Sequence, residues 1–272
     1  MSHSAPAVAQ HFDRLGRTGE WADLYRAARN PRDEWSFLRR QNALETLMAD
    51  LAPPGAAVVE IGPGTGNLVP FFAARGCAYR AFDIAPAMID QTRAAIRRAF
   101  PPGADARCDP GDLACLPLPD HAADLAVAAG VFEYLPDLPA AARELARIVR
   151  PGSGHALVSL PNARSLNRIL GRRLNGVTRA AHALRRRAGR AIPPPDVDRR
   201  PLAPRAAADL FRAAGFVVEA LAYYDYEVLV YPLNRLAPSL AFAAKRFVEP
   251  RRLAPGCFFA NAYVLRLRRA AG

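Results

Sequence analysis

Three glycines stand at alternate positions of the segment 62–66, directly after the apolar run 57–61. Glycine has no Cβ atom, so such a turn lets a ligand approach the main chain and permits positive φ angles. The next acidic residue after Glu60 is Asp83, which ends the next apolar run. A carboxylate at that place can accept hydrogen bonds from both hydroxyls of a ribose. The glycine turn and Asp83 together predict a site for a nucleoside-containing cofactor.

Two classes of cofactor are compatible with this pair. A dinucleotide fingerprint of the form G-x-G-x-x-G would need a glycine at position 67, where the chain has Asn67. A cofactor without a pyrophosphate has less need of that third glycine. The sequence therefore disfavours an NAD-dependent oxidoreductase but keeps it as an alternative.

The elements that must position these residues follow a βαβ pattern. Apolar runs alternate with helical patterns, which predicts five strands joined by right-handed crossovers. Two later β-like runs are expected to extend the sheet, one of them antiparallel. The predicted fold class is α/β, a Rossmann-like doubly wound sheet of seven mostly parallel strands with one antiparallel strand near the C-terminus. The predicted strands are 57–61, 78–82, 106–108, 124–129, 155–160, 216–224 and 258–267.

The chain divides into four predicted parts. Phe37, Leu44 and Met48 recur at helical spacing before the turn at 53–55, which indicates an N-terminal helical cap. The parts are a cap at 1–54, a cofactor-binding core at 55–160, a basic lid or insertion at 161–203, and a C-terminal part of the core sheet with an inserted helical connection at 204–272.

Several further motifs follow the glycine turn in a fixed order. The series reads E-I-G-P-G-T-G at 60–66, F-D-I at 82–84 with Met88 behind it, G-D-L at 111–113, L-P-L-P-D at 116–120, A-D-L-A-V at 123–127, G-V-F-E-Y-L-P-D at 130–137 and R-I-V-R-P-G at 147–152. In order and spacing this series resembles the class I S-adenosylmethionine-dependent methyltransferase family. Similar members often have histidine where this chain has Tyr134.

The resemblance implies S-adenosyl-L-methionine as cofactor, with S-adenosyl-L-homocysteine as product. It implies that the glycine turn approaches the methionine part, Asp83 binds the ribose, and Asp112 accepts a hydrogen bond from the adenine amino group. An apolar slot would hold the adenine, and the start of the helix after Gly130 would flank the sulfonium. The implied cofactor-binding residues are Glu60, Gly62, Pro63, Gly64, Asp83, Ile84, Met88, Asp112, Leu113 and Gly130.

The residues that would meet the acceptor are less clearly marked. Methyl transfer is an in-line displacement that positioning alone can accelerate, and a general base is required only when the acceptor is poorly ionised. We therefore assign no catalytic side chain. The candidate substrate-binding residues are Tyr134, Asn162, Tyr224 and Tyr226.

A basic insertion carries much of the net charge of +12. The segment 161–195 contains nine arginines and no acidic residue, with apolar residues near helical period. It could be a substrate lid, or a basic amphipathic helix that rests on an anionic membrane, aided by the apolar connection 228–244. RNA binding is a weaker alternative, because the insertion has no aromatic side chain on which a base could stack.

The predicted function is S-adenosylmethionine-dependent methyl transfer to a small, hydrophobic acceptor that is natural-product-like, quinone-like or lipid-like. The alternatives are an RNA methyltransferase and a non-catalytic protein that binds a nucleotide cofactor. The four cysteines form no C-x-x-C pair, so we expect no metal site. The first thirty residues lack the apolar core of a signal peptide, so we expect a cytoplasmic protein, with possible contact at the inner face of the membrane.

Overall fold

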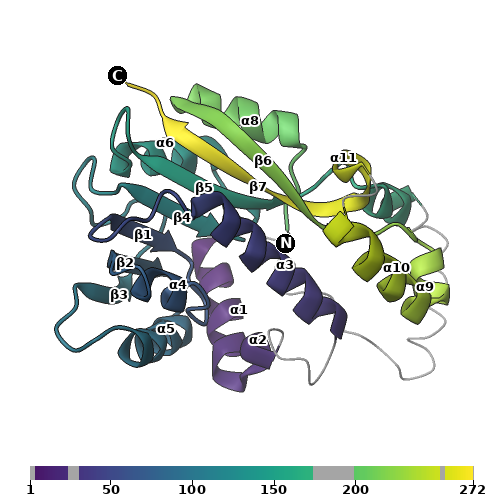
Figure 1. Ribbon diagram of the computed structural model, residues 1–272, viewed down its shortest axis with the longest axis horizontal. Helices are drawn as coiled ribbons and strands as arrows, with labels where there is room; N and C mark the ends of the chain where they lie inside the picture. Colours follow the sequence, from purple (N-terminus) through teal and green to yellow (C-terminus); the bar gives the residue numbers. More distant parts are fainter. Residues whose placement is uncertain (1–3, 24–30, 174–198, 252–254, 272) are drawn as a thin grey trace.

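A seven-stranded sheet with the order β3-β2-β1-β4-β5-β7-β6 forms the centre of the computed structural model (Figure 1). The structure describes residues 4–23, 31–173, 199–251 and 255–271. The predicted α/β class is confirmed. The strands are β1 (Ala57–Ile61), β2 (Ala78–Asp83), β3 (Ala106–Pro110), β4 (Leu125–Ala129), β5 (His155–Pro161), β6 (Phe216–Tyr226) and β7 (Ala260–Arg269).

The last two strands give the sheet its mixed character. β1 pairs in parallel with β2 and β4, and the parallel pairing continues to β3 on one side and β5 on the other. β7 lies between β5 and β6 and is antiparallel to both. β6 therefore runs in the direction of β5, and its carboxyl end reaches the same edge of the sheet as the carboxyl ends of β1 and β2. Ligands of open α/β sheets bind at that edge.

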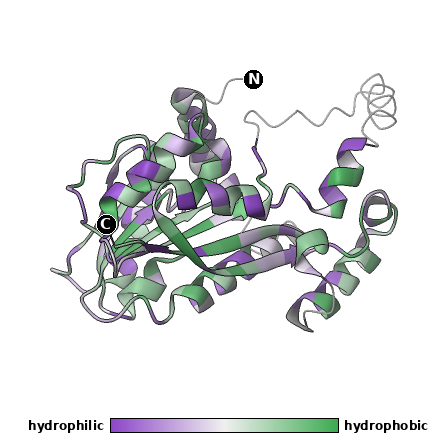
Figure 2. Ribbon diagram, turned by 90° about the horizontal axis from the view of Figure 1, so that it is seen from above, coloured by the Kyte–Doolittle hydropathy of each residue, from purple (hydrophilic) through white to green (hydrophobic). Residues whose placement is uncertain are grey.

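Helices cover both faces of the sheet, as the view from above shows (Figure 2). One face packs against α3, α4 and α5, and the other packs against α6 and α8. The apolar run of β1 is buried on both faces of the sheet. Val58 packs in the core on the side of α3, α4 and α5, and Val59 packs in the core on the side of α6 and α8. These helices are α3 (Pro31–Met48), α4 (Val69–Ala73), α5 (Pro86–Ala99), α6 (Leu138–Ile148) and α8 (Pro204–Ala213).

Two shorter elements complete the edge where the strands end. A 3₁₀ turn, η1 (Phe132–Tyr134), follows β4. Before α3 the chain forms α1 (Ala5–Thr18) and α2 (Glu20–Asp23), and α1 packs against α5. The sequence analysis expected a helical cap but did not locate α1, whose apolar face includes Val8 and Phe12 at i,i+4 spacing.

The connection between β6 and β7 contains three helices, α9 (Leu233–Leu236), α10 (Pro238–Arg251) and α11 (Gly256–Phe259). Buried ionic groups fasten α10 to α3 and to the end of β6. Lys245 donates to Asp225, and Glu249 accepts hydrogen bonds from Arg39 and from the backbone of Asp225. Lys245 and Glu249 are both nearly inaccessible to solvent. α10 is thus held by charge pairing as well as by apolar packing.

The predicted basic insertion falls largely outside the described residues. Residues 166–173 are helical, and the described chain resumes at Arg199. Arg200 N donates to Glu133 O at 2.8 Å, and Leu202 N donates to Pro161 O at 3.1 Å. The segment that returns from the insertion is therefore fixed beside η1 and the end of β5.

No helix in the described part of the chain is long and apolar enough to cross a membrane.

Candidate cofactor and acceptor site

The glycine turn after β1 requires glycine for steric reasons. Gly62 and Gly64 have φ angles of +65° and +61°, which side chains rarely adopt. A Cβ atom on Gly62 would lie 2.6 Å from Cγ2 of Val131, in the loop after β4. Gly62 N donates to Phe82 O at 2.8 Å, which ties the turn to the end of β2. The main chain of this turn is thereby held at the edge of the cavity that lies beside it.

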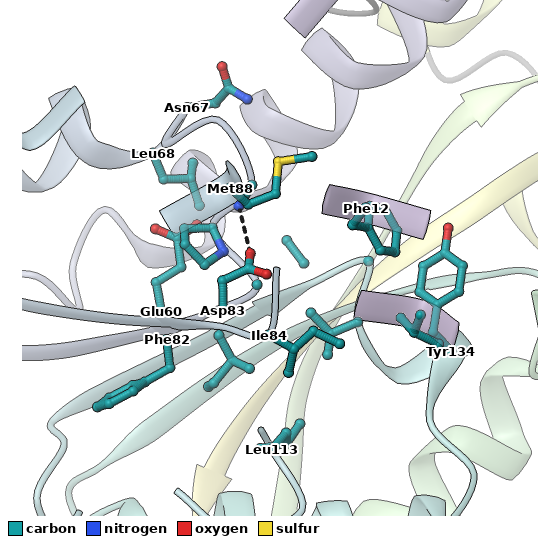
Figure 3. Close-up of a pocket in the computed structure, with 18 of the residues that line it drawn as sticks. Phe12, Glu60, Asn67, Leu68, Phe82, Asp83, Ile84, Met88, Leu113 and Tyr134 are labelled. Carbon is teal, nitrogen blue, oxygen red and sulfur yellow. Dashed lines mark hydrogen bonds between the residues drawn. The ribbon is translucent and has the colours of Figure 1, made fainter. Parts of the chain in front are cut away.

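Asp83 ends β2 and points into the same cavity (Figure 3). Its carboxylate accepts hydrogen bonds from Ala85 N at 2.9 Å and from Gly64 N at 3.4 Å. Burial raises the pKa of Asp83 to about 6, although the two backbone donors favour the charged form. Asp83 is therefore ionised at neutral pH and keeps lone pairs to accept hydroxyl donors from a ligand.

Glu60, one residue before the end of β1, also lines the cavity. The hydroxyl of Tyr79, on the neighbouring strand β2, donates to Glu60 Oε2 at 2.6 Å. Burial raises the pKa of Glu60 to about 7, while the Tyr79 hydroxyl and Arg40 favour its charged form. The two buried acids, Glu60 and Asp83, stand at the ends of adjacent strands.

An apolar slot lies beside Asp83. Ile84, Met88 and Leu113 line it, and Asp112 closes its rim with Oδ1 accepting from Ala114 N at 2.9 Å. Met88 and Leu113 are almost completely buried. The slot has the form that a flat, apolar ring with one polar edge would fill.

An aromatic cap covers the other side of the cavity. Phe12 of α1 contacts Tyr134 edge to face at a centroid distance of 5.2 Å and Trp21 of α2 at 5.3 Å. Figure 3 shows Phe12 and Tyr134 beside each other, on the side of the cavity away from Glu60. Two polar contacts dock α1 onto α5, since Ala87 N donates to Asp13 and Gln91 donates to Gly16 O.

α3 adds side chains that the sequence analysis did not single out as ligand contacts. Phe37, Arg40, Gln41 and Leu44 line the cavity, and Trp21 contacts Phe37 at a centroid distance of 5.7 Å. Arg40 Nη1 lies 2.8 Å from where a Cβ atom on Gly130 would be. The i,i+3 and i,i+4 spacing of these residues places them on one helix face, and this spacing is the signal by which they could have been found in the sequence.

All ten residues predicted to bind the cofactor line this one cavity, which encloses about 960 Å³ including the part open to solvent. They come from β1 and the glycine turn after it, from β2 and α5, and from the segments that follow β3 and β4. They are Glu60, Gly62, Pro63, Gly64, Asp83, Ile84, Met88, Asp112, Leu113 and Gly130.

The four predicted substrate-binding residues are not gathered in one place. Tyr134 lines the cavity, whereas Asn162, Tyr224 and Tyr226 are buried outside its lining. The side-chain amide of Asn162 donates to Cys257 O and Ala260 O. Its Oδ1 accepts from Arg164 N at 2.9 Å. The amide of Asn162 thus joins the end of β5 to the segment before β7.

In the part of the chain that the structure describes, neither a histidine nor a cluster of metal ligands lines the cavity. His155 lies 3.2 Å from Glu219, between β5 and β6, and does not line the cavity. Among the described residues, no group of three or more His, Cys, Asp or Glu side chains could hold a metal ion.

The sheet order and the acid-and-glycine cavity define an α/β protein of the class I S-adenosylmethionine-dependent methyltransferase type. Residues 34–221 match the model of a methyltransferase domain family, and because this is more than half of the chain, the protein belongs to that family. S-adenosylmethionine is the cofactor of that class, as the prediction stated.

Individual proteins similar to this chain fall in the same class. A malonyl-[acyl-carrier protein] O-methyltransferase of Serratia marcescens is 32% identical over 151 residues, which are 54% of this chain and 55% of that protein. The chain spans about half the length of the curated relatives it matches.

Two solved structures show the shared fold. Magnesium protoporphyrin IX methyltransferase of Synechocystis PCC 6803, with bound SAH, superposes with a TM-score of 0.67 at 14% identity over 98% of this chain and 100% of that one. A chain from the complex of the Haloferax volcanii Trm112 methyltransferase activator with a putative methyltransferase gives a TM-score of 0.65 at 18% identity, over 95% and 97%.

Proposed function

We propose that this protein transfers a methyl group from S-adenosyl-L-methionine to a small acceptor with an apolar body. The observation that carries the proposal is the position of Asp83, a buried carboxylate that accepts a hydrogen bond from Gly64 N of the glycine turn and lines the same cavity. A carboxylate with free lone pairs beside an exposed main chain is suited to a ribose and the group attached to it.

The side chains around the cavity fit the parts of this cofactor. Asp83 would accept the two ribose hydroxyls, and the slot of Ile84, Met88 and Leu113 would hold the adenine, with Asp112 at its amino edge. Arg40 supplies a cation that lines the cavity beside Gly130, which the carboxylate of the methionine part would meet. The donors and acceptors present thus match the charges of the cofactor.

When bound, S-adenosylmethionine would supply a methyl group on a sulfonium: a lone pair of the acceptor would form the bond to the methyl carbon, and the electron pair of the broken C–S bond would go to the sulfur of the departing S-adenosylhomocysteine. The protein's part is to orient the two reactants and to exclude water. Phe12, Trp21 and Tyr134 form an apolar wall that serves both purposes. No side chain in this proposal has to take up a proton.

The same aromatic wall supports an acceptor with a hydrophobic body, of natural-product, quinone or lipid type. The Serratia marcescens relative is named for O-methylation of a malonyl group on a carrier protein. Oxygen is accordingly the acceptor atom that we propose to test first.

The test is a calorimetric titration of the protein with S-adenosylhomocysteine, with NAD as the parallel control. We expect micromolar binding of S-adenosylhomocysteine and none of NAD, followed by transfer of radiolabelled methyl to at least one member of an acceptor panel. Binding of NAD alone would overturn the proposal. Binding of S-adenosylhomocysteine without transfer to any acceptor would favour a non-catalytic binding protein.

We propose in addition that α9 and α10 contact an anionic lipid surface. Leu236 is 77% exposed and Leu240 is 61% exposed, and Leu233 and Phe247 are also exposed on these two helices. Exposed apolar patches of this kind mark interaction sites. The net charge of +12 would favour anionic headgroups, which could present a lipid-like acceptor.

Flotation with vesicles tests this membrane contact. The protein should bind phosphatidylglycerol vesicles better than phosphatidylcholine vesicles, and binding should weaken with salt. Replacing Leu236 and Leu240 by serine should reduce binding, whereas Leu38→Ser, at an exposed leucine of α3, should not. Equal binding to both vesicles would contradict the proposal.

A further inference from the structure

Glu133 is a buried carboxylate that the proposed chemistry does not use. It lies in η1, directly before Tyr134, and its side chain is 6% exposed. Its Oε2 atom is buried without a hydrogen-bond partner in the described structure. Burial raises the pKa of Glu133, while Arg199, Arg40 and Arg168 oppose this by favouring the charged form. Three guanidinium groups thus act on one buried acid.

Among the described residues around Glu133, the positive charges exceed the negative ones. Arg40 lies beside Gly130 and lines the cavity, so its charge is shared between Glu133 and the cavity. Asp225 also acts on Arg168, but it is already paired with the buried Lys245. Among the described residues, Glu133 is therefore the acid that Arg168 and Arg199 share. A cluster with this excess of positive charge is suited to an anionic ligand.

Arg168 has an unused donor. It belongs to the helical residues 166–173, and its Nε atom is buried without a partner. Burial and the neighbouring Arg172 and Arg199 lower the pKa of Arg168. A buried donor without an acceptor destabilises the protein, and this cost is removed when a ligand supplies the acceptor.

Arg199 connects this charge to the cavity. Its guanidinium carbon lies 5.9 Å from the centroid of the Tyr134 ring. The hydrogen bond from Arg200 N to Glu133 O holds the adjacent backbone in place. Tyr134 lines the cavity on the side away from Glu60 (Figure 3). Because Arg199 lies beside the Tyr134 ring, its charge is at the acceptor end.

We propose that Arg168 and Arg199 form an anion subsite beside Tyr134 and that the acceptor carries a carboxylate or phosphate group. This inference rests on the proposed function and names the substrate class of the same site. Arginine binds both oxyanions through paired N–H donors, which a neutral isostere cannot match. The acceptor therefore combines an apolar body, against Phe12 and Tyr134, with an anionic group.

Paired probes that differ only in charge test the subsite. The protein is first saturated with S-adenosylhomocysteine, and this titration is itself the test of the proposed cofactor. Octanoate is then titrated against octanamide, and octyl phosphate against octanol. We expect at least one anion to bind about tenfold more tightly than its neutral partner. The pair with the larger ratio distinguishes a carboxylate from a phosphate subsite.

Variants identify the residues responsible. Arg168→Leu and Arg199→Leu should each remove most of the preference for the anion, while Arg173→Leu, at an exposed arginine of the same helical segment as Arg168, should keep it. All three should bind S-adenosylhomocysteine as the wild type does, which shows that they are folded. If S-adenosylhomocysteine binds but anion and neutral probe bind equally, or neither binds up to its solubility limit, the anion subsite is wrong. An anion preference that survives in both variants contradicts it as well.

Discussion

The two ends of the cavity are built in different ways. At the cofactor end, the ends of β1 and β2 and the glycine turn present main-chain groups and short acids from the segment 60–113. At the acceptor end, side chains come from α1, α2, α3 and η1, and Arg199 approaches from the segment after the insertion. The first end is fixed by neighbouring strands, and the second is assembled from segments far apart in the sequence.

The electrostatic character of the two ends also differs. The cofactor end contains two buried carboxyl groups, Glu60 and Asp83, whose pKa values are raised by burial. The acceptor end combines aromatic rings with guanidinium groups around Glu133. One end is thus specified by backbone geometry and the other by tertiary packing.

Asp83→Ala should have the largest effect, on the cofactor end alone. Loss of two charge-assisted hydrogen bonds to the ribose should weaken S-adenosylhomocysteine binding about a hundredfold or more, measured by calorimetry. Asp109→Ala, at a half-exposed acid of β3, is the control and should bind normally. Unchanged affinity in Asp83→Ala would show that the cofactor lies elsewhere.

Glu60→Gln should change how stability depends on pH. Burial raises the pKa of Glu60 from 4.5 to about 7, so between these values the folded protein keeps a proton that the unfolded chain releases. The free energy of unfolding of the wild type should therefore fall as pH rises through this window, by roughly 3 kcal/mol relative to the variant.

Urea unfolding of both proteins at several pH values measures this difference. Glu20→Gln, at an exposed acid of α2, should follow the wild type at every pH. Parallel curves for wild type and Glu60→Gln would mean that Glu60 is not strongly desolvated.

Gly62→Ala should destabilise the turn more than a glycine substitution without steric conflict. The new Cβ would lie 2.6 Å from Val131 at a φ of +65°. Gly55→Ala is the matched control, with a φ of +79° and nothing within 4 Å of the new atom. We expect a loss of about 1 kcal/mol for Gly55→Ala and roughly 2–3 kcal/mol for Gly62→Ala in thermal unfolding. Equal losses of stability in the two variants would indicate that the positive φ angle alone, and not the contact with Val131, sets the cost of the substitution.

Phe12→Ala should have the smallest effect and should act through the cap. Removal of the ring leaves Tyr134 and Trp21 without their shared aromatic contact, so S-adenosylhomocysteine binding should weaken about tenfold, with little loss of global stability. Gln10→Ala, at an exposed position of α1, is the control. A loss in Phe12→Ala as large as that of Asp83→Ala would remove the distinction between the two ends.

The sequence predicted the sheet and the residues of the cofactor end because their signals are local. Strand ends, glycine spacing and Asp83 follow from periodicity and backbone chemistry within short segments, and the ten predicted residues do line one cavity. Whether they bind the cofactor stays a prediction. The positions of Phe12 and Arg40 at the site depend on how α1 and α3 pack, which no local pattern specifies.

The residues predicted to contact substrate show the same limit. Asn162, Tyr224 and Tyr226 were chosen because they stand at strand ends on the ligand edge. Strand position does not tell which way a side chain turns, and the amide of Asn162 bonds to the main chain before β7 instead of facing the cavity. Arg199 follows a long insertion, so its approach to Tyr134 could not be inferred from spacing.

The place of β7 in the sheet sets the order in which this protein can be completed during synthesis. β7 lies between β5 and β6, so β6 has no partner strand until residues 260–269 have left the ribosome. α3 packs against both β6 and β7, so its contacts with the sheet are completed only after β7 has been synthesised. The helix that carries Arg40 is thus made among the first elements of the chain and secured among the final ones.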